Sequence, residues 1–221
     1  MYMNEIAEPP VANARNPRKN NPEKTREDIL RAAIAEFVSE GLSGARVDAI
    51  AERTHTSKRM IYYYFGSKEQ LYVEVLEKLY GDIRKTESEL HLTELEPREA
   101  IRRTVEFAFD HHDRNGDFVR IVSVENIHHG EYVKKSTAIR SMSNTMLHSL
   151  AEILRRGEAA GVFRSGIDPL DVHLLISSFC FYRMSNRHTF GEIFQIDLAD
   201  EQIKQRHKQM ICEAVLRYIQ V

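Results

Sequence analysis

Two cations and three phenols gather in the short segment KRMIYYYF, residues 58–65. Ile61 and Phe65 stand four residues apart, which predicts one narrow buried stripe on a helix and leaves the polar side chains outward. Ammonium, guanidinium and phenol groups donate hydrogen bonds, and such donors hold phosphate oxygens and read base edges. The segment therefore favours contact with duplex nucleic acid. The outward positions are Lys58, Arg59, Tyr62, Tyr63 and Tyr64.

The residues before this segment predict that it is the second helix of a helix-turn-helix. Val47–Thr54 is predicted to form a first short helix, residues 55–57 a three-residue turn, and Ser57 the N-cap of the second helix. The alternative is that Tyr62–Tyr64 belong to a core and the cations are ordinary solvated charge. Three consecutive tyrosines cover nearly the whole circumference of a helix, so at least one is exposed under either interpretation.

Residues 25–76 resemble the N-terminal domain of the TetR/AcrR family of one-component transcriptional regulators. The resemblance covers about a quarter of the chain and rests on four motifs, ILRAAIAEFVSEG, VDAIAERT, TSKRMIYYYF and SKEQLY. It implies DNA binding through the second helix and a contact between Lys68 and the DNA backbone. Arg59 and Met60 depart from the small and polar residues that members often carry there, which leaves the operator sequence open.

Phosphate contacts are also expected beside the second helix. Thr25-x-x-Asp28 has the pattern of a capping box, and the helix N-terminus with Thr25 would hold a phosphate. Arg46 is either a phosphate contact or a solvated charge. Lys68 stands in the first turn of a helix capped by Ser67, where it opposes the helix dipole by about 0.3–1 kcal/mol, and a bound phosphate would offset that cost. The complete predicted DNA-binding set is Thr25, Arg46, Thr56, Ser57, Lys58, Arg59, Tyr62, Tyr63, Tyr64 and Lys68.

Charge separates along the chain although the net charge is only −2. Residues 15–68 hold 11 Lys or Arg and seven Asp or Glu, a net +4, so the remainder carries −6. A basic head on an acidic body directs the head toward DNA. Residues 1–22 hold four of the six prolines and no periodicity, which predicts a flexible arm. Its residues Arg15, Arg18 and Lys19 either follow the phosphates or only solubilise the chain.

Composition bounds the class of protein. A chain of 221 residues with 42% apolar content can bury a full core. No apolar run approaches the ~18–20 residues of a membrane span, and the N-terminus lacks the apolar centre of a secretion signal, so we expect a cytoplasmic protein with no membrane partner. Cys180 and Cys212 have no metal-binding spacing, which favours buried thiols, with a redox pair as the alternative. No cofactor is expected.

The periodicity predicts an all-α fold of about nine helices, with no alternating segment long enough for a strand. The expected domains are a three-helix DNA-binding domain at 23–70 and a larger domain for effector binding and dimerisation at 71–221. We expect a polar linker at Thr86–Glu96, a long helix at Tyr132–Ala160 and another helix from Pro169 to about Thr189.

The apolar faces of three helices predict how the two domains are coupled and how the chain forms a dimer. The helix after Ser67 carries a stripe that runs past the DNA-binding unit, so motion at its far end would move the second helix of the helix-turn-helix. The two closing helices carry broader apolar faces than one body needs. The family resemblance implies that they pack against their copy in a homodimer, and a two-fold dimer doubles the contacts on a palindrome. The stripe is Leu71, Val75, Leu79 and Ile83.

The resemblance also implies a small-molecule site inside the second domain, where apolar walls mix with a few polar groups. The segment FYRMSNRHTFGEIF, with the sixth-helix region, resembles the body of pyrimidine-catabolism regulators of the family, which favours a planar, polar or aromatic metabolite. The candidate effector residues are His111, His112, Asn126, His129, Tyr132, Met142, Met146, Phe179, Tyr182, Arg183 and Asn186.

Each of these candidates has a structural alternative. Met142 and Met146 also suit a plain core. The pairs His111–His112 and His128–His129 are adjacent in sequence, so their members point to different faces and neither pair alone would clamp a metal. Arg183 lies on a largely apolar helix and requires a carboxylate partner, a place in the dimer seam or an anionic ligand.

The leading hypothesis is a homodimeric, ligand-responsive transcriptional regulator, most simply a repressor that binds a palindromic operator through Lys58–Tyr64. Activators and effector-independent regulators are alternatives within the family. An enzyme using His111, Asp113 and a distant Cys180 is the alternative from another class, but the chain has no nucleophile elbow, glycine-rich phosphate loop or metal-binding helix motif. A helical protein-interaction module is the third alternative.

Overall fold

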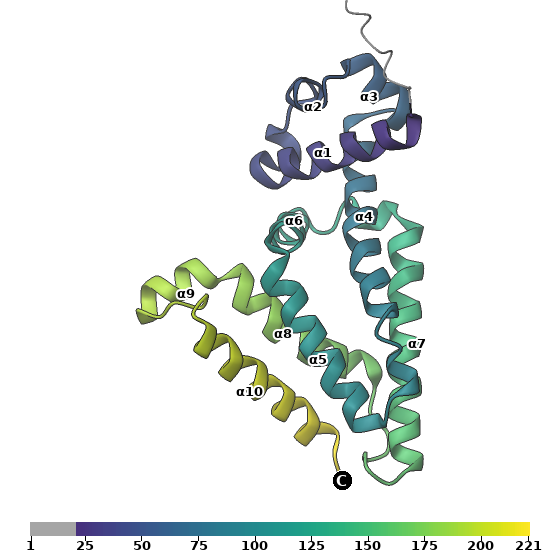
Figure 1. Ribbon diagram of the computed structural model, residues 1–221, viewed down its shortest axis with the longest axis vertical. Helices are drawn as coiled ribbons and strands as arrows, with labels where there is room; N and C mark the ends of the chain where they lie inside the picture. The colour runs from purple at the N-terminus through teal and green to yellow at the C-terminus, as the bar shows by residue number, and fades with distance from the viewer. Residues whose placement is uncertain (1–20) are drawn as a thin grey trace, which may run out of the picture.

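The computed structural model describes residues 21–221, which form ten α-helices and two short 3-10 helices (Figure 1). Within this range the only extended pairing is an isolated bridge between Phe163 and Gln220. The all-α prediction is therefore confirmed for the described part of the chain. The elements are α1 (Pro22–Gly44), α2 (Val47–Thr54), α3 (Lys58–Phe65), α4 (Lys68–Ser88), η1 (Leu92–Glu94), α5 (Pro97–Arg114), α6 (Gly116–Ile127), η2 (Val133–Lys135), α7 (Thr137–Ala159), α8 (Pro169–Ser185), α9 (Arg187–Phe194) and α10 (Glu201–Ile219).

The helices form a head and a body that share α4. The head consists of α1, α2, α3 and the first turns of α4, and it lies at the top of Figure 1, above the helices α5–α10 of the body. Leu71 and Val75 of α4 are fully buried in the core of the head. That core also contains Ile121 of α6 and Ile139 of α7, so apolar packing is continuous between the head and the body.

Local capping signals set several of the helix boundaries as predicted. Ser57 Oγ accepts a hydrogen bond from Met60 N at 3.2 Å and begins α3, and Ser67 Oγ accepts one from Gln70 N at 3.1 Å and begins α4. The Asp168 side chain caps α8, whose first residue is Pro169. These caps are local, so a sequence pattern is enough to find them.

The predicted start of the first helix at Thr25 is wrong. The helix begins at Pro22, and the Asn21 side chain accepts a hydrogen bond from Lys24 N at 3.2 Å. Proline at the first helical position has a preset φ and no N–H to satisfy, so Asn21 and Pro22 start the helix one turn earlier. Residues 1–20, which hold the rest of the predicted arm, lie outside the described range.

The body differs from the prediction at three helix ends. The predicted linker contains the last turn of α4 and the 3-10 helix η1, whose Leu92 is buried. The long helix starts at Thr137 because Ser136 Oγ accepts from Ile139 N at 3.1 Å and forms the N-cap. Helix α8 ends at Ser185 and is followed by the separate helix α9, which our count of about nine helices did not include.

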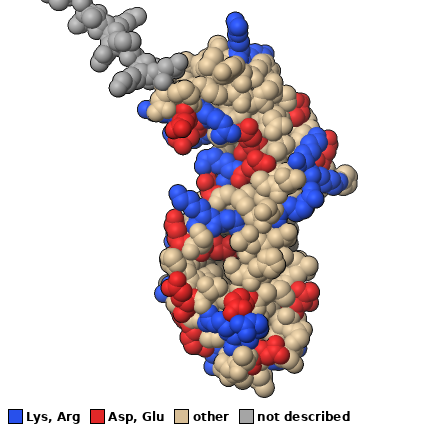
Figure 2. Space-filling model, turned by 90° about the vertical axis from the view of Figure 1, so that its right-hand side faces the viewer, with Lys and Arg blue, Asp and Glu red and all other residues tan. Residues whose placement is uncertain are grey.

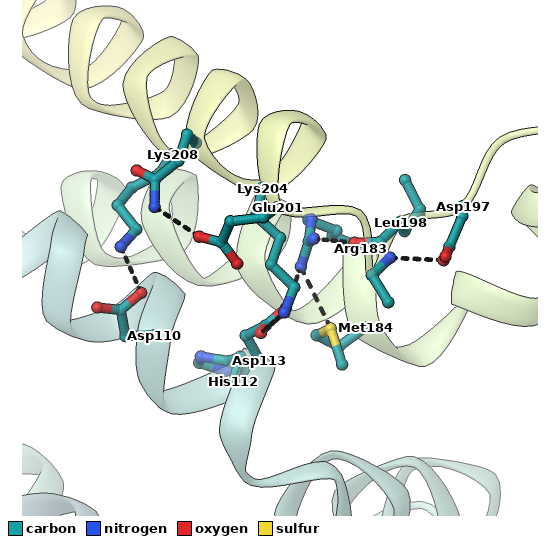
Figure 3. Close-up of polar contacts among 12 residues, drawn as sticks. Asp110, His112, Asp113, Arg183, Met184, Asp197, Leu198, Glu201, Lys204 and Lys208 are labelled. Atoms are coloured by element: carbon teal, nitrogen blue, oxygen red, sulfur yellow. Dashed lines mark hydrogen bonds and ion pairs between the residues drawn. The ribbon is translucent and has the colours of Figure 1, made fainter.

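A cluster of ion pairs joins α5, α8 and α10 (Figure 3). Asp113 of α5 accepts from Arg183 Nη1 at 2.7 Å and pairs with Lys204 Nζ at 3.0 Å. Burial raises the pKa of Asp113, but the hydrogen bonds from the two cations outweigh it and hold the pKa below its ordinary value. Asp110 adds a pair with Lys208 at 2.6 Å, so two carboxylates of α5 fix the position of α10.

Close packing at Gly157 on α7 gives a stability prediction. A Cβ added to Gly157 would stand 1.9 Å from the ring of the buried Phe163, which closes the turn between α7 and α8. We expect Gly157→Ala to lower the free energy of unfolding by about 1–3 kcal/mol, the usual cost of overpacking. Urea denaturation at fixed protein concentration measures this change. Gly116→Ala is the control, since a Cβ at Gly116 meets nothing within 4 Å; equal stability of the two variants would contradict the prediction.

Candidate nucleic-acid interface and ligand cavity

Helix α3 presents a polar, aromatic face on the surface of the head. Ile61 and Phe65 are buried and fix the helix to the core, while Tyr62 is 39% exposed and Tyr63 is 78% exposed. Tyr64 differs from the prediction because it is only half-exposed: its ring packs against the core of the head and meets the Tyr63 ring edge-on at 5.5 Å. Of the three phenols, those of Tyr62 and Tyr63 are therefore exposed to solvent.

The turn before α3 fixes its angle to α2. His55 adopts a left-handed conformation with φ of 51° and closes α2, and its N–H donates to the carbonyls of Ala51 and Glu52. Across the turn, Lys58 Nζ pairs with the Asp48 carboxylate at 3.1 Å, and both side chains are about half exposed. An acidic group thus stands beside a predicted phosphate ligand and competes with phosphate for it.

Arg46 is exposed and its backbone is held by a buried carboxylate. Glu36 of α1 is only 3% exposed, and its Oε1 accepts from Arg46 N at 2.9 Å while Oε2 pairs with Arg53 at 3.1 Å. Glu36 therefore satisfies an amide at the start of α2 that would otherwise lack a partner. Sequence analysis missed Glu36, although its position on the buried face of α1, next to Phe37, was a signal that this carboxylate has a structural partner.

The remaining predicted DNA-binding residues occupy different settings. Lys68 lies half-buried at the start of α4, with Nζ 3.4 Å from the Ser43 carbonyl oxygen. Thr25 lies inside α1, where its N–H and hydroxyl both donate to the Asn21 carbonyl, so the expected helix-end phosphate site at Thr25 is wrong in its geometry. Arg59 is exposed and Thr56 is half-exposed, and both lie on the turn or on the first turn of α3.

The charge of the described head is nearly balanced. Residues 21–68 hold eight Lys or Arg and seven Asp or Glu, because Arg15, Arg18 and Lys19 lie outside the described range. The face shown in Figure 2 likewise carries basic and acidic side chains interspersed rather than one continuous basic patch. Any preference of the head for a polyanion therefore depends on where its cations lie, not on a large net charge.

A cavity of about 360 Å³ lies in the body between the far end of α4 and helices α5, α7 and α8. Of the predicted effector residues, it brings together His112, Met142 and Met146. The lining residues that sequence analysis did not include are Ile83, Arg84, Glu87, Ser88, His91, Leu92, Thr93, Thr104, Phe107, Ala108, Thr145, Ser149, Leu150, Ile153, His173, Ile176 and Ser177.

The charged and titratable groups of this cavity influence one another. Arg84 and Glu87 form an ion pair on the last turns of α4 with side chains 19% and 17% exposed. Burial raises the pKa of Glu87, and Arg84 opposes that rise. Burial also lowers the pKa of His112 and of His173 below the ordinary value, and in each case the Arg84 cation acts in the same direction. Both imidazoles are therefore neutral at pH 7.

The other predicted effector residues do not line this cavity. Asn126 and His129 are exposed, and Tyr132 stacks edge-on with Tyr72 at 5.3 Å in the packing beneath the head. His111 lines a different pocket, beside Phe118, and burial lowers its pKa to about 4. Asn186 caps the junction of α8 and α9 and donates to the Tyr182 carbonyl.

Phe179, Tyr182 and Arg183 line a second, smaller cavity of about 170 Å³ between α8, α9 and α10. Arg183 is 5% exposed: Nη1 donates to Asp113 and Nη2 to the Leu198 carbonyl, while Nε is buried without a hydrogen-bond partner in the described structure. Its guanidinium lies 4.7 Å from the Phe109 ring. The salt-bridge alternative for Arg183 thus agrees with the structure. The buried-thiol expectation is confirmed as well: both cysteines are free and buried, and burial raises the pKa of Cys180 to about 12 and that of Cys212 to about 11.

Comparison with known protein families shows to which family the chain belongs. Residues 29–75 match the family described as bacterial regulatory proteins, tetR family, and residues 97–215 match the tetracyclin repressor-like C-terminal domain. The chain belongs to the TetR family. The two matches divide it as the structure does, into a helix-turn-helix head and a larger helical body.

Relatives of this TetR-family chain are transcriptional regulators. The chain is 38% identical over 200 residues to the HTH-type transcriptional repressor NicS of Pseudomonas putida, which covers 90% of this chain and 94% of NicS. It is 30% identical over 132 residues to the repressor SCO4008 of Streptomyces coelicolor, covering 54% of this chain and 65% of that protein. The crystal structure of a regulator, SCO4942 of Streptomyces coelicolor, aligns with a TM-score of 0.66 at 25% identity, covering 88% and 98% of the two chains.

These matches bear on the alternative classes. The family is one of transcriptional regulators and not of enzymes, so the enzyme alternative is set aside. Across residues 21–221, no three His, Cys, Asp or Glu side chains are grouped as a metal site would require. Within the same range no helix has both the length and the apolar character needed to cross a membrane.

The Lys58–Asp48 pair gives a prediction for this TetR-family head. Asp48→Asn should strengthen binding to any duplex about two- to fivefold at low salt, because it removes a charge that repels phosphate and frees Lys58 from an exposed ion pair. Fluorescence anisotropy with a labelled duplex at several salt concentrations measures this effect. Asp82→Asn, which removes the same charge from a pair on α4, is the control. Weaker binding by Asp48→Asn than by the control variant would contradict the prediction.

Proposed function

We propose that the protein is a homodimeric transcriptional repressor whose two α3 helices bind a palindromic operator and whose body releases the operator when a small molecule enters the cavity. The observation that carries the proposal is the continuity of α4. This helix begins at Lys68, directly behind α3, and ends with Arg84 and Glu87 in the wall of the cavity. Over its 21 residues it spans about 30 Å, so one rigid element joins the two sites.

The proposed DNA contacts divide into two kinds. The first turn of α3 would enter the major groove, with Arg59 placed to read base edges. Exposed or half-exposed hydroxyl, ammonium and guanidinium groups on either side would hold the phosphates and fix the register of the head. The proposed phosphate ligands are Arg46, Thr56, Ser57, Lys58, Tyr62, Tyr63, Tyr64 and Lys68.

The proposed dimer forms through α8 and α10. Leu174 of α8 is 62% exposed and Met210 of α10 is 48% exposed, which leaves an apolar surface next to the body core. Pairing this surface with its copy about a two-fold axis would bury it and place two heads on one side of the dimer. Other exposed apolar residues on the same two helices are Leu170, Tyr182 and Tyr218.

Release of the operator would be a population shift. A ligand that favours the conformer in which the two α3 helices are wrongly spaced lowers the affinity for the operator, and the operator lowers the affinity for the ligand by the same factor. A factor of 100 corresponds to about 2.7 kcal/mol of coupling, which is within the ordinary range. The proposed effector is a planar aromatic or polar metabolite, and the proposed site of action is the cytoplasm.

The first prediction of this proposal concerns phosphate contacts. Lys68→Ala should weaken binding to specific and random duplexes alike and reduce the slope of log affinity against log salt by about one, because one phosphate-binding cation is removed. Tyr63→Phe should weaken both about tenfold without changing the slope, because only a neutral donor is removed. Lys85→Ala, at the other end of α4, is the control. Duplex binding that does not weaken with salt would favour a protein-interaction module instead.

A second prediction separates base reading from phosphate contact. Substituting Arg59 by Ala should reduce the affinity ratio between the protein's own promoter region and a random duplex about tenfold, since a base contact contributes about 1–3 kcal/mol of discrimination. Anisotropy titrations with the two duplexes measure this ratio. An unchanged ratio would remove Arg59 from the base-reading role.

A third prediction concerns the dimer. Leu174→Glu should give a monomer in sedimentation at micromolar concentration and lower operator affinity at least a hundredfold, because a buried unpaired carboxylate is costly at an apolar interface. Ile127→Glu, which alters an apolar side chain 72% exposed on α6, is the matched control and should stay dimeric. A dimer formed equally well by both variants would show that α8 is not at the interface.

A further inference from the structure

Arg84 is the only Lys or Arg in the wall of the larger cavity among the residues that the structure describes. Its side chain belongs to the last turns of α4 and is 19% exposed. Nη1 donates to Glu87, while Nε is fully buried and has no hydrogen-bond partner in the described structure. A guanidinium has five N–H donors. Arg84 thus keeps N–H groups that Glu87 does not use, on a side chain that lines a cavity large enough for a small molecule.

Several other polar groups of the wall already use their donors, while the Thr93 and Ser149 hydroxyls and the His173 ring also line the cavity. The hydroxyls of Thr104, Thr145 and Ser177 each donate to a carbonyl four residues earlier in their own helix. Neutral His112 donates from Nδ1 to the Ala108 carbonyl at 2.7 Å, so its second ring nitrogen is an acceptor. A ligand that enters this cavity therefore meets one guanidinium, Arg84, among hydroxyls, imidazoles and apolar side chains.

Glu87 stands where an acidic ligand group would bind. It lies one turn after Arg84 on the same helix and also lines the cavity. Burial already disfavours its charged form, so the Glu87 carboxylate is more easily protonated or displaced than an exposed glutamate. Loss of the Glu87 charge from the pair would leave an uncompensated buried guanidinium, which strongly favours a replacement anion.

We infer that the cavity takes a small organic anion, with one acidic group on an apolar body, and that this acidic group binds Arg84 in place of the Glu87 carboxylate. The inference rests on the proposed role of the cavity as the effector site and adds the chemical class of the ligand. Ile83, Met146 and Ile153 are among the apolar side chains that would surround the body of the ligand. The exchange takes place on α4 itself, so the ligand acts directly on the helix that carries the head.

The test uses two fluorescent probes that share one skeleton. They are 1-anilinonaphthalene-8-sulfonate, which carries one anionic group, and N-phenyl-1-naphthylamine, which lacks it. Dissociation constants for both are measured on the full chain. The wild-type protein should bind the anionic probe more tightly than the neutral probe. Arg84→Gln should weaken the anionic probe about tenfold or more, equal to about 1.4 kcal/mol, and change the neutral probe less than twofold.

Three further variants test whether misfolding, or probe binding outside the cavity, could explain this result. Glu87→Gln removes the competing carboxylate and should tighten binding of the anionic probe about three- to tenfold while leaving the neutral probe unchanged. Partial unfolding exposes apolar surface and would raise binding of both probes, so the two causes are distinguishable. Arg155→Gln removes an arginine that is 68% exposed outside the cavity and should change neither constant. Ser149→Phe narrows the cavity and should weaken both probes.

The outcomes separate the inference from the proposed function. If Ser149→Phe weakens both probes but Arg84→Gln leaves their affinity ratio unchanged, the cavity binds ligands and the anion inference is overturned. If Ser149→Phe affects neither probe, the cavity is not a ligand site and the effector part of the proposed function fails with it. The inference is supported if Arg84→Gln lowers the ratio of the affinity for the anionic probe to the affinity for the neutral probe, and Glu87→Gln raises that ratio.

Discussion

The structure depends on the double burial of α4. Leu71, Val75 and Leu76 of this helix are fully buried in the head, while Ile83 is buried eight residues after Val75, in the wall of the body cavity. A helix held in two packed environments cannot rotate or slide without disturbing both, because protein interiors are close-packed. The proposed coupling between cavity and head would use this double packing. In the body, α4 packs mainly against α7, and α7 in turn contacts α5 and α8, which ion pairs of α5 join to each other and to α10.

Much of the head could be predicted from the sequence because its signals are local. The stripe of Val47, Ile50 and Ala51, the caps at Ser57 and Ser67 and the apolar pair Ile61 and Phe65 each lie within one or two turns. The bounds of α2 and α3 therefore agreed with the structure. The start of α1 could not be chosen as reliably, because two capping patterns overlap and the choice depended on a proline at the first helical position.

The cavity was predicted only in part because its polar residues look like surface charge in sequence. Arg84 and Glu87 fall near the end of α4, in a stretch rich in exposed charged residues, although Glu87 stands four residues after Ile83 and so continues the buried stripe. His173 is separated from His112 by 61 residues, and only the packing of α5 against α8 brings both to one wall. Asn126 and His129 had suitable chemistry but lie at the exposed end of α6, where nothing encloses a ligand.

The Asp48 carboxylate beside Lys58 has a consequence for the behaviour of a repressor on a chromosome. Repulsion between Asp48 and the DNA backbone acts equally at every site, whereas base contacts add affinity only at the operator. A uniform loss of affinity leaves the ratio between operator and random sequence unchanged, and this ratio decides how many copies are needed to occupy one promoter among about a million or more competing sites. The repulsion therefore acts on time and not on copy number: each copy leaves a wrong sequence sooner and reaches the next site earlier.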